Sequence, residues 1–194
     1  MIGNDGQKPM PWIAFKTMTI IMGIRKKFRN IEEEVCLCGI KINDHVLDFG
    51  CGIGFNTIPA AQKVGDSGKV YALDINPQAI KIINKKIVRF NLRNVEPILS
   101  DCKTNLPDES IDIVYLHNTF PLLKDKKGVF NEIYRVLKTR GKLSYMSRKL
   151  SYLAGNRSSE GIPATDRELT EYLNSTYKCI KEEKGHLIFE KLNK

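Results

Sequence analysis

Short apolar segments alternate along the chain with longer stretches in which apolar residues recur at helical spacing. The segments 46–47, 70–73 and 111–116 are typical of strands buried on both faces of a parallel sheet. The stretch after the first of them predicts a helix with an inner face of Phe55, Ile58, Ala61 and Val64. Strands that alternate with helices in this way predict an α/β fold.

The alternation continues toward the middle of the chain. Residues 77–90 predict a helix, started by Asn76-Pro77, with Lys81, Lys85 and Arg89 outside. Its inner face should carry Ile80, Ile83, Ile87 and Phe90. Residues 95–102 then predict a third strand that ends in Asp101-Cys102.

The last third predicts the end of the sheet. Residues 129–147 should form a helix, a turn at Gly141 and a fifth strand, followed by a polar loop over 147–162 that could carry substrate specificity. Thr165 and Glu168 form a capping box that opens a helix. Strands over 177–182 and 186–192, joined at Lys184-Gly185, then predict a hairpin.

The first 39 residues predict a helical extension to a domain over 40–194. Residues 11–29 form an expected helix that is apolar around much of its circumference and basic at its end. It could pack on the domain, form a lid over the site, or lie on a membrane surface. A shorter helix is expected from Asn30, its cap, to Gly39, its stop.

Composition agrees with one globular domain. Of 194 residues, 42% are hydrophobic and 27% are charged. No apolar stretch is long enough to span a bilayer, and the first residues lack the pattern of a signal peptide. Five cysteines, an odd number, then indicate a reduced, cytoplasmic protein. Cys36 and Cys38 should point to different faces of a helix, so no metal site is expected.

The net charge of +9 is concentrated in residues 126–194, which hold 15 basic and 8 acidic residues. Such an excess could attract nucleic acid, anionic lipid or an acidic substrate. Aromatic residues are not interleaved with it, which favours a solvated basic surface. The basic residues that lie close together are Arg135, Lys138, Arg140, Lys142, Arg148 and Lys149.

The stretch HVLDFGCGIGF (45–55) carries the main candidate chemistry. It predicts a strand, a glycine loop and a helix start, where backbone amides and the helix dipole can face a ligand. The dinucleotide pattern GxGxxG does not fit, because its third glycine would fall on Phe55. The pattern is D-x-G-x-G-x-G, from Asp48 to Gly54.

A carboxylate at the end of the second predicted strand is the next candidate. Asp74 could accept both hydroxyls of a ribose, a geometry that a neutral residue matches less well. An acid in this place also suits the ribose of NAD, so Asp74 alone does not distinguish NAD from another ligand that contains a ribose.

At these motifs the chain resembles the class I S-adenosylmethionine-dependent methyltransferases. The resemblance implies a doubly wound, mostly parallel seven-stranded sheet of order 3-2-1-4-5-7-6, with an antiparallel last hairpin. It implies S-adenosylmethionine as cofactor, with Asp74 on the ribose, Asp101 on the adenine amino group and the Cys102 amide on the ring. The complete donor site would comprise Asp48, Gly50, Cys51, Gly52, Gly54, Phe55, Asp74, Ile75, Asp101, Cys102 and His117.

His117 is expected to begin the loop after the fourth strand, which falls where donor and acceptor meet in this family. It could act as a general base, or it could line the donor site only through its backbone. No other catalytic residue is indicated. Asn118-Thr119 does not match the Asn-Pro-Pro-aromatic pattern of enzymes that methylate exocyclic amino groups of DNA bases.

Three phrases indicate a branch of the family. GFNTIPAA, YALDINP and EIYRVL look most like the methyltransferases of ubiquinone and menaquinone biosynthesis. The longer phrase EIYRVLKTRGKL resembles the pattern EIxRVLKPGGxL of the whole family, with Thr139-Arg140 in place of the usual Pro-Gly. This resemblance implies methyl transfer to a small-molecule acceptor. Two alternatives are an RNA methyltransferase that uses the basic last third and a non-catalytic donor-binding protein.

Overall fold

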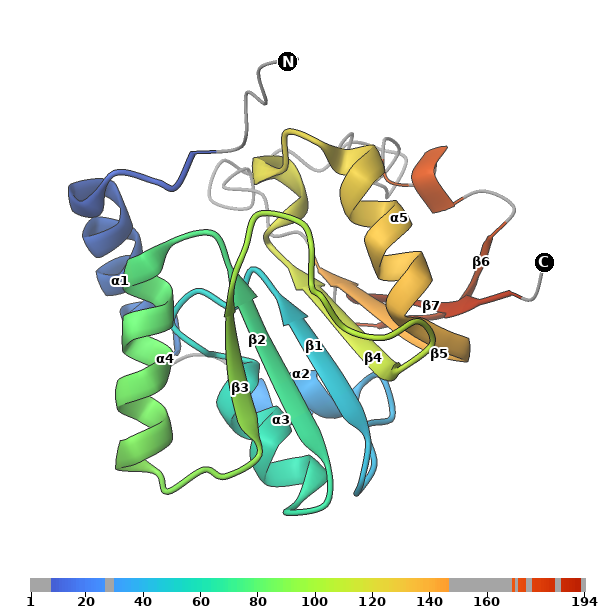
Figure 1. Ribbon diagram of the computed structural model, residues 1–194, viewed down its shortest axis with the longest axis horizontal. Helices are drawn as coiled ribbons and strands as arrows, with labels where there is room; N and C mark the ends of the chain where they lie inside the picture. The colour runs from blue at the N-terminus through green and yellow to red at the C-terminus, as the bar shows by residue number, and fades with distance from the viewer. Residues whose placement is uncertain are drawn as a thin grey trace.

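The computed structural model describes residues 8–26, 30–146, 169, 171–173, 176–183 and 186–192. A seven-stranded sheet forms its centre, with the order β3-β2-β1-β4-β5-β7-β6 (Figure 1). Neighbouring strands are parallel from β3 to β5, and β7 is antiparallel to both β5 and β6. The predicted topology is confirmed. The strands are β1 (His45–Phe49), β2 (Lys69–Asp74), β3 (Val95–Leu99), β4 (Ile111–His117), β5 (Leu137–Met146), β6 (Tyr177–Glu183) and β7 (His186–Lys191).

Helices cover both faces of this sheet (Figure 1). Val35, Ala61 and Ile83, from α2, α3 and α4, belong to the buried cluster on one face. Ile133 of α5 and Leu173 belong to the cluster on the other face. The helices are α1 (Trp12–Lys26), α2 (Ile31–Cys36), α3 (Thr57–Val64), α4 (Pro77–Arg89) and α5 (Lys126–Val136), with a 3-10 turn, η1, at Phe120–Leu122.

The central strand β4 shows why its sequence is apolar at nearly every position. Ile113 and Tyr115 point into the cluster with α2 and α3, while Val114 and Leu116 point into the cluster with α5. Successive side chains of a strand point to opposite faces, so a strand covered on both sides needs apolar residues throughout.

Two asparagines begin helices where the sequence predicts them. The Asn30 side chain accepts a hydrogen bond from the Glu33 amide at 3.1 Å, and the Asn76 side chain accepts one from the Gln78 amide at 3.0 Å. Each side-chain oxygen satisfies an amide that the first helical turn leaves without an intrahelical partner.

Several predicted boundaries are corrected. Phe90 is exposed rather than inward, because α4 ends at Arg89 and Phe90 is its C-cap. β3 ends at Leu99, so Asp101 and Cys102 follow the strand, and His117 is the last residue of β4 rather than part of the loop. The turn expected at Gly141 is an irregularity within β5, where the register with β4 shifts.

Part of the predicted C-terminal region lies outside the described residues. This applies to the polar loop over 147–162, to the capping box of Thr165 and Glu168, and to the turn at Lys184-Gly185. Within the helix predicted over 166–175, residue 169 and residues 171–173 are helical.

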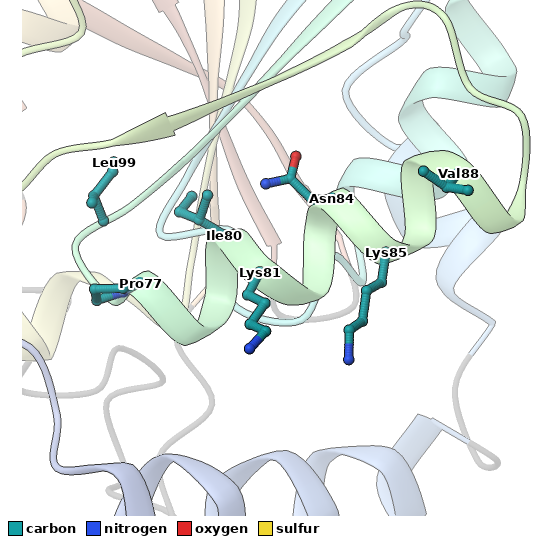
Figure 2. A pocket seen from close by; sticks show the side chains of 7 residues that line it. All are labelled: Pro77, Ile80, Lys81, Asn84, Lys85, Val88 and Leu99. Carbon is teal, nitrogen blue, oxygen red and sulfur yellow. The ribbon is translucent and has the colours of Figure 1, made fainter.

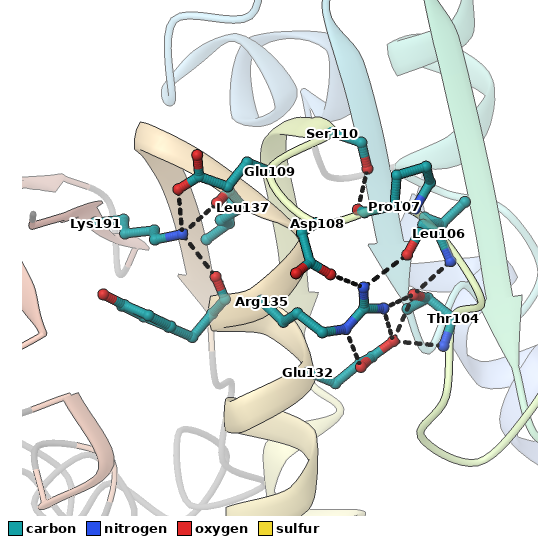
Figure 3. Close-up of polar contacts among 11 residues, drawn as sticks. Thr104, Leu106, Pro107, Asp108, Glu109, Ser110, Glu132, Arg135, Leu137 and Lys191 are labelled. Carbon is teal, nitrogen blue, oxygen red and sulfur yellow. Dashed lines mark hydrogen bonds and ion pairs between the residues drawn. The ribbon is translucent and has the colours of Figure 1, made fainter. Parts of the chain in front are cut away.

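Four residues of the predicted basic cluster lie in the described part of the chain and contact acids or carbonyls, and Figure 3 shows Arg135 among them. Arg135 pairs with Glu132 at 2.7 Å and with Asp108 at 2.5 Å, and its hydrogen bond lowers the pKa of Glu132 to about 2. Lys138 pairs with Asp112, Arg140 lies 3.7 Å from Glu190, and Lys142 donates to the Cys38 carbonyl. The expected basic cluster is therefore mostly balanced by acids where it is described; Arg148 and Lys149 fall outside.

Candidate functional site

The glycine loop is fastened to the end of the neighbouring strand through its backbone. The amides of Gly50 and Cys51 both donate to the Leu73 carbonyl, at 2.8 and 2.9 Å, and the Gly54 amide donates to the Cys51 carbonyl at 2.8 Å. These bonds fix the loop between β1 and α3 against the carboxyl end of β2.

The Asp74 carboxylate, at the end of β2, contacts this loop. Its Oδ2 accepts from the Gly52 amide and its Oδ1 from the Asn76 amide, each at 2.8 Å. Burial raises the pKa of Asp74, and the two amide donors partly oppose that rise. A carboxylate oxygen has room for more than one donor, so both oxygens can still accept hydroxyl groups from a ligand.

Two glycines of the loop lie where a side chain would either occupy open space or collide with a neighbouring helix. Gly52 has a φ of 53°, and a Cβ added there would meet nothing within 4 Å, so the backbone opens onto free space beside Asp74. Gly54 has a φ of 77°, and a Cβ there would lie 2.6 Å from Cδ1 of Ile83. The loop thus needs glycine once to leave room for a ligand and once to approach α4.

Asp48 lies behind the loop. It is only 1% exposed, and its carboxylate accepts from Thr57 Oγ1 at 2.6 Å and from Asn56 Nδ2 at 3.5 Å. Burial raises the pKa of Asp48 to about 6. The structure places this carboxylate as a link between β1 and the start of α3.

Cys51, Phe55 and Ile75 complete the inner wall of this region. The Cys51 side chain is buried, and burial together with Asp48 and Asp74 raises the pKa of its thiol. Phe55 is partly buried against the cluster that holds α3 and α4, and Ile75 is partly buried after Asp74. These three side chains pack against their neighbours and are not suited to proton transfer.

The end of β3 brings the remaining donor-site candidates to the same edge. β2 and β3 pair Asp74 with Leu99, and the Ser100 amide donates to the Asp74 carbonyl at 3.1 Å. Asp101 is exposed, and the Cys102 amide donates to Ser100 Oγ at 3.3 Å. The candidates on the first three strands therefore lie together at their carboxyl ends.

Three contacts at this edge are not predicted by the sequence. Lys86 Nζ donates to the Ile53 carbonyl of the loop at 2.5 Å, and Asn76 Nδ2 donates to the Met10 carbonyl at 3.3 Å. Thr119 lies where a side chain at Gly50 would run into it. Lysines in a basic helix look alike in sequence, so nothing distinguishes Lys86 from its neighbour Lys85 before the fold is known.

His117 belongs to a buried polar group on the α2 side of the sheet. Its Nε2 lies 2.9 Å from Ser144 Oγ, and its ring meets the ring of His186 edge to face at 5.1 Å between centroids. Nε2 of His186 lies 3.9 Å from Oε2 of Glu34. This buried histidine group (Glu34, His117, Ser144, His186) joins β4, β5, β7 and α2.

The donor edge, defined as the loop over 50–54 together with Asp74, Ile75, Asp101 and Cys102, suits a ligand with a vicinal diol and a polar part that binds backbone. The Asp74 oxygens can accept hydroxyl groups, and the open side of Gly52 lets a ligand reach the loop backbone. In open α/β sheets, ligands bind outside the carboxyl ends of the strands. The fold and this edge together fit an α/β domain of the class that binds nucleosides.

Comparison with known proteins then gives the family. Residues 40–191 match the family described as methyltransferase domain, and the chain belongs to this family. A demethylmenaquinone methyltransferase of Lactobacillus johnsonii is 38% identical over 109 residues, which are 55% of this chain and 45% of the relative. An arsenite methyltransferase of Halobacterium salinarum is 36% identical over 51% of this chain and 26% of the relative.

A solved structure is similar to this protein over a larger share of the chain. The SAM-dependent methyltransferase from Aquifex aeolicus has a TM-score of 0.71 and 25% identity, and the match covers 84% of this chain and 90% of that one. The aligned part of the present chain spans less than half the length of the first curated relatives. Among the described residues, none of the helices is both long and apolar enough to cross a bilayer.

Proposed function

We propose that this chain transfers a methyl group from S-adenosylmethionine to a small-molecule acceptor. The observation that carries the proposal is the Asp74 carboxylate, held by two amides beside the open backbone of Gly52. Family membership and the named activities of the relatives support it.

The residues at the donor edge fit this cofactor. Asp74 would accept the ribose hydroxyls, the loop over 50–54 would bind through its backbone, and Ile75, Asp101 and Cys102 would border the adenine. When bound, the donor supplies a methyl group already activated by a positively charged sulfur. Asp48 would act on the ligand indirectly, by holding α3 behind the loop.

The tasks left to the chain are alignment of the acceptor and exclusion of water. The segment that leads into α1 touches the donor edge, since the Met10 carbonyl accepts from Asn76. This contact supports a covering role for the extension over 1–39. For His117, burial and the Ser144 contact support a positioning role rather than that of a general base.

A small acceptor is favoured over RNA. The relatives are named for demethylmenaquinone, arsenite and aklanonic acid, which are all small molecules. The basic residues that suggested RNA are paired with acids at Arg135, Lys138 and Arg140.

We also propose a cytoplasmic location for this chain. The odd number of cysteines supports it.

Incubation with methyl-labelled donor tests this function. Purified chain is mixed with cell extract that has been separated into small-molecule and RNA fractions, and the Asp74→Asn variant serves as the control. We expect label only in the small-molecule fraction, and less of it with the Asp74→Asn variant than with the unaltered chain at the same donor concentration. Label in RNA contradicts the acceptor class, and tight donor binding without transfer to either fraction indicates a non-catalytic donor-binding protein.

A further inference from the structure

The outer face of α1 exposes an isoleucine stripe, defined here as Ile13, Ile20 and Ile24. These residues are seven and four positions apart, so they lie on one face of the helix, and they are 72, 57 and 57% exposed. The opposite face buries Phe15, which is 5% exposed. α1 is therefore apolar on a face that does not pack on its own domain.

The segment that carries the stripe is basic in sequence. Residues 6–31 contain six lysines and arginines and no acidic residue. Lys16 Nζ lies 5.0 Å from the centre of the exposed Trp12 ring, next to the stripe. An exposed apolar face beside cations and without anions is complementary to an anionic lipid surface.

α4 extends the basic character on the same side of the molecule (Figure 1). Residues 75–95 contain five lysines and arginines and again no acidic residue. Figure 2 shows Lys81 and Lys85 leaving α4 on the side where α1 runs. A pocket of about 580 Å³ lies along this helix and is lined by Pro77, Ile80, Lys81, Asn84, Lys85, Val88 and Leu99.

We propose that α1 docks this chain on the surface of an anionic membrane, with the isoleucine stripe in the interface and the cations of α1 and α4 near the headgroups. Nucleic acid would use the cations but would gain little from exposed isoleucines, because its affinity comes mainly from phosphate contacts. Lipid uses both features, and it is the ligand class that the stripe favours.

Docking would place the donor edge close to the membrane. The Met10 carbonyl, just before α1, accepts from Asn76, and the Asn76 amide donates to Asp74. An acceptor dissolved in the bilayer could then approach from the same side. The docking itself does not depend on the proposed methyl transfer, so either can fail without the other.

Co-sedimentation of the whole chain with lipid vesicles tests the proposal. We expect binding to phosphatidylcholine vesicles that contain about one third phosphatidylserine, little binding to pure phosphatidylcholine, and weakening by salt. Replacing the stripe by serine (Ile13→Ser, Ile20→Ser, Ile24→Ser) should lower the vesicle affinity about ten-fold or more. Ile42→Ser is the matched control, because Ile42 is 73% exposed, lies before β1, and should leave binding unchanged.

Unfolding curves and donor titration on the same variants show whether the fold and donor site are intact. Equal vesicle binding by the stripe variant and the unaltered chain overturns the proposal. Binding to a homopolymeric RNA but not to anionic vesicles overturns it in favour of nucleic acid. Self-association that the stripe variant loses, without vesicle binding, overturns it in favour of a second copy of the chain.

Discussion

The donor edge and the buried histidine group differ in the chemical groups that make their contacts. At the donor edge one carboxylate, Asp74, meets backbone amides of a loop whose glycine leaves open space. In the buried histidine group, side chains from separate strands meet each other, as His117 does with Ser144 and His186. The first arrangement leaves acceptor oxygens and open backbone for the proposed ligand; the second stabilises the packing of β4, β5 and β7.

This difference leads to a rule for mutations. Changes at the donor edge should alter ligand affinity more than stability, while changes in the buried histidine group should alter stability more than ligand affinity. Asp48 should behave as part of the packing although it belongs to the loop motif, because it is enclosed by Thr57 and Asn56.

The largest expected effect concerns Asp48 and pH. Its pKa is raised from 3.8 to about 6, so the folded chain holds this proton more tightly than the unfolded chain. Ionisation therefore lowers stability as pH rises from about 4 to about 6, by about 3 kcal/mol in total. Relative to the Asp48→Asn variant, the unaltered chain should lose this free energy of unfolding in urea titrations across that range. Parallel curves for the two proteins contradict this assignment.

Ser144→Ala should affect stability through the buried histidine group. It removes a buried hydrogen-bonding contact of 2.9 Å with His117, and we expect a loss of about 1–2 kcal/mol in free energy of unfolding. Donor affinity should change less than about two-fold. Ser110→Ala is the control, since the Ser110 hydroxyl bonds to the Pro107 carbonyl at an exposed site and should cost less than about 0.5 kcal/mol. A large loss of donor affinity in Ser144→Ala contradicts the expectation that the buried histidine group affects stability more than ligand affinity.

Lys86→Met tests the loop from the side of α4. Removing the bond to the Ile53 carbonyl should loosen the loop and weaken donor binding by about 1 kcal/mol, or about five-fold. Lys85→Met removes the same charge from the same helix at an exposed position and should have little effect. Equal losses in the two variants, measured by donor titration, mean that net charge rather than loop contact governs affinity.

Arg140→Gly should have the smallest effect, and it should be stabilising. Arg140 has a φ of 62°, where a residue with a Cβ is strained, and its ion pair with Glu190 is exposed at 3.7 Å. Glycine should relieve the strain and raise the free energy of unfolding by about 0.5–1 kcal/mol. Donor affinity should stay the same, and a drop in stability shows that the side-chain contacts of Arg140 outweigh the strain.

The contact between the glycine loop and Asp74 is predictable from short sequence patterns, although the two lie 22 residues apart, because it is made by backbone at the ends of paired parallel strands. The glycine spacing from 50 to 54 and the acid at the end of β2 are enough to place Gly52 beside Asp74, once parallel strands align their ends. The same reasoning places Asn76 as a helix cap, because the bond it makes lies within its own turn.

The buried histidine group is not predictable in this way. His186 reaches His117 because β7 returns antiparallel beside β5, and the Tyr115 hydroxyl reaches the Val35 carbonyl across 80 residues. The paired state of Arg135 also depends on contacts with Asp108 and Glu132 that no local pattern reveals. Charge counts along the sequence therefore overstate the free positive charge of this region.

Calorimetric titration with S-adenosylmethionine and with its demethylated thioether tests the proposed donor site most directly. Both ligands should bind the unaltered chain at one site, and Asp74→Asn should weaken both by about 1–3 kcal/mol through loss of charged hydrogen bonds. The variant can accept from only one of the two amides that hold Asp74, so part of its free energy of unfolding is lost, and the titration is made where unfolding curves show the variant to be folded. Absence of heat with both ligands, or the same affinity with and without the Asp74 carboxylate, contradicts the donor site proposed at this edge.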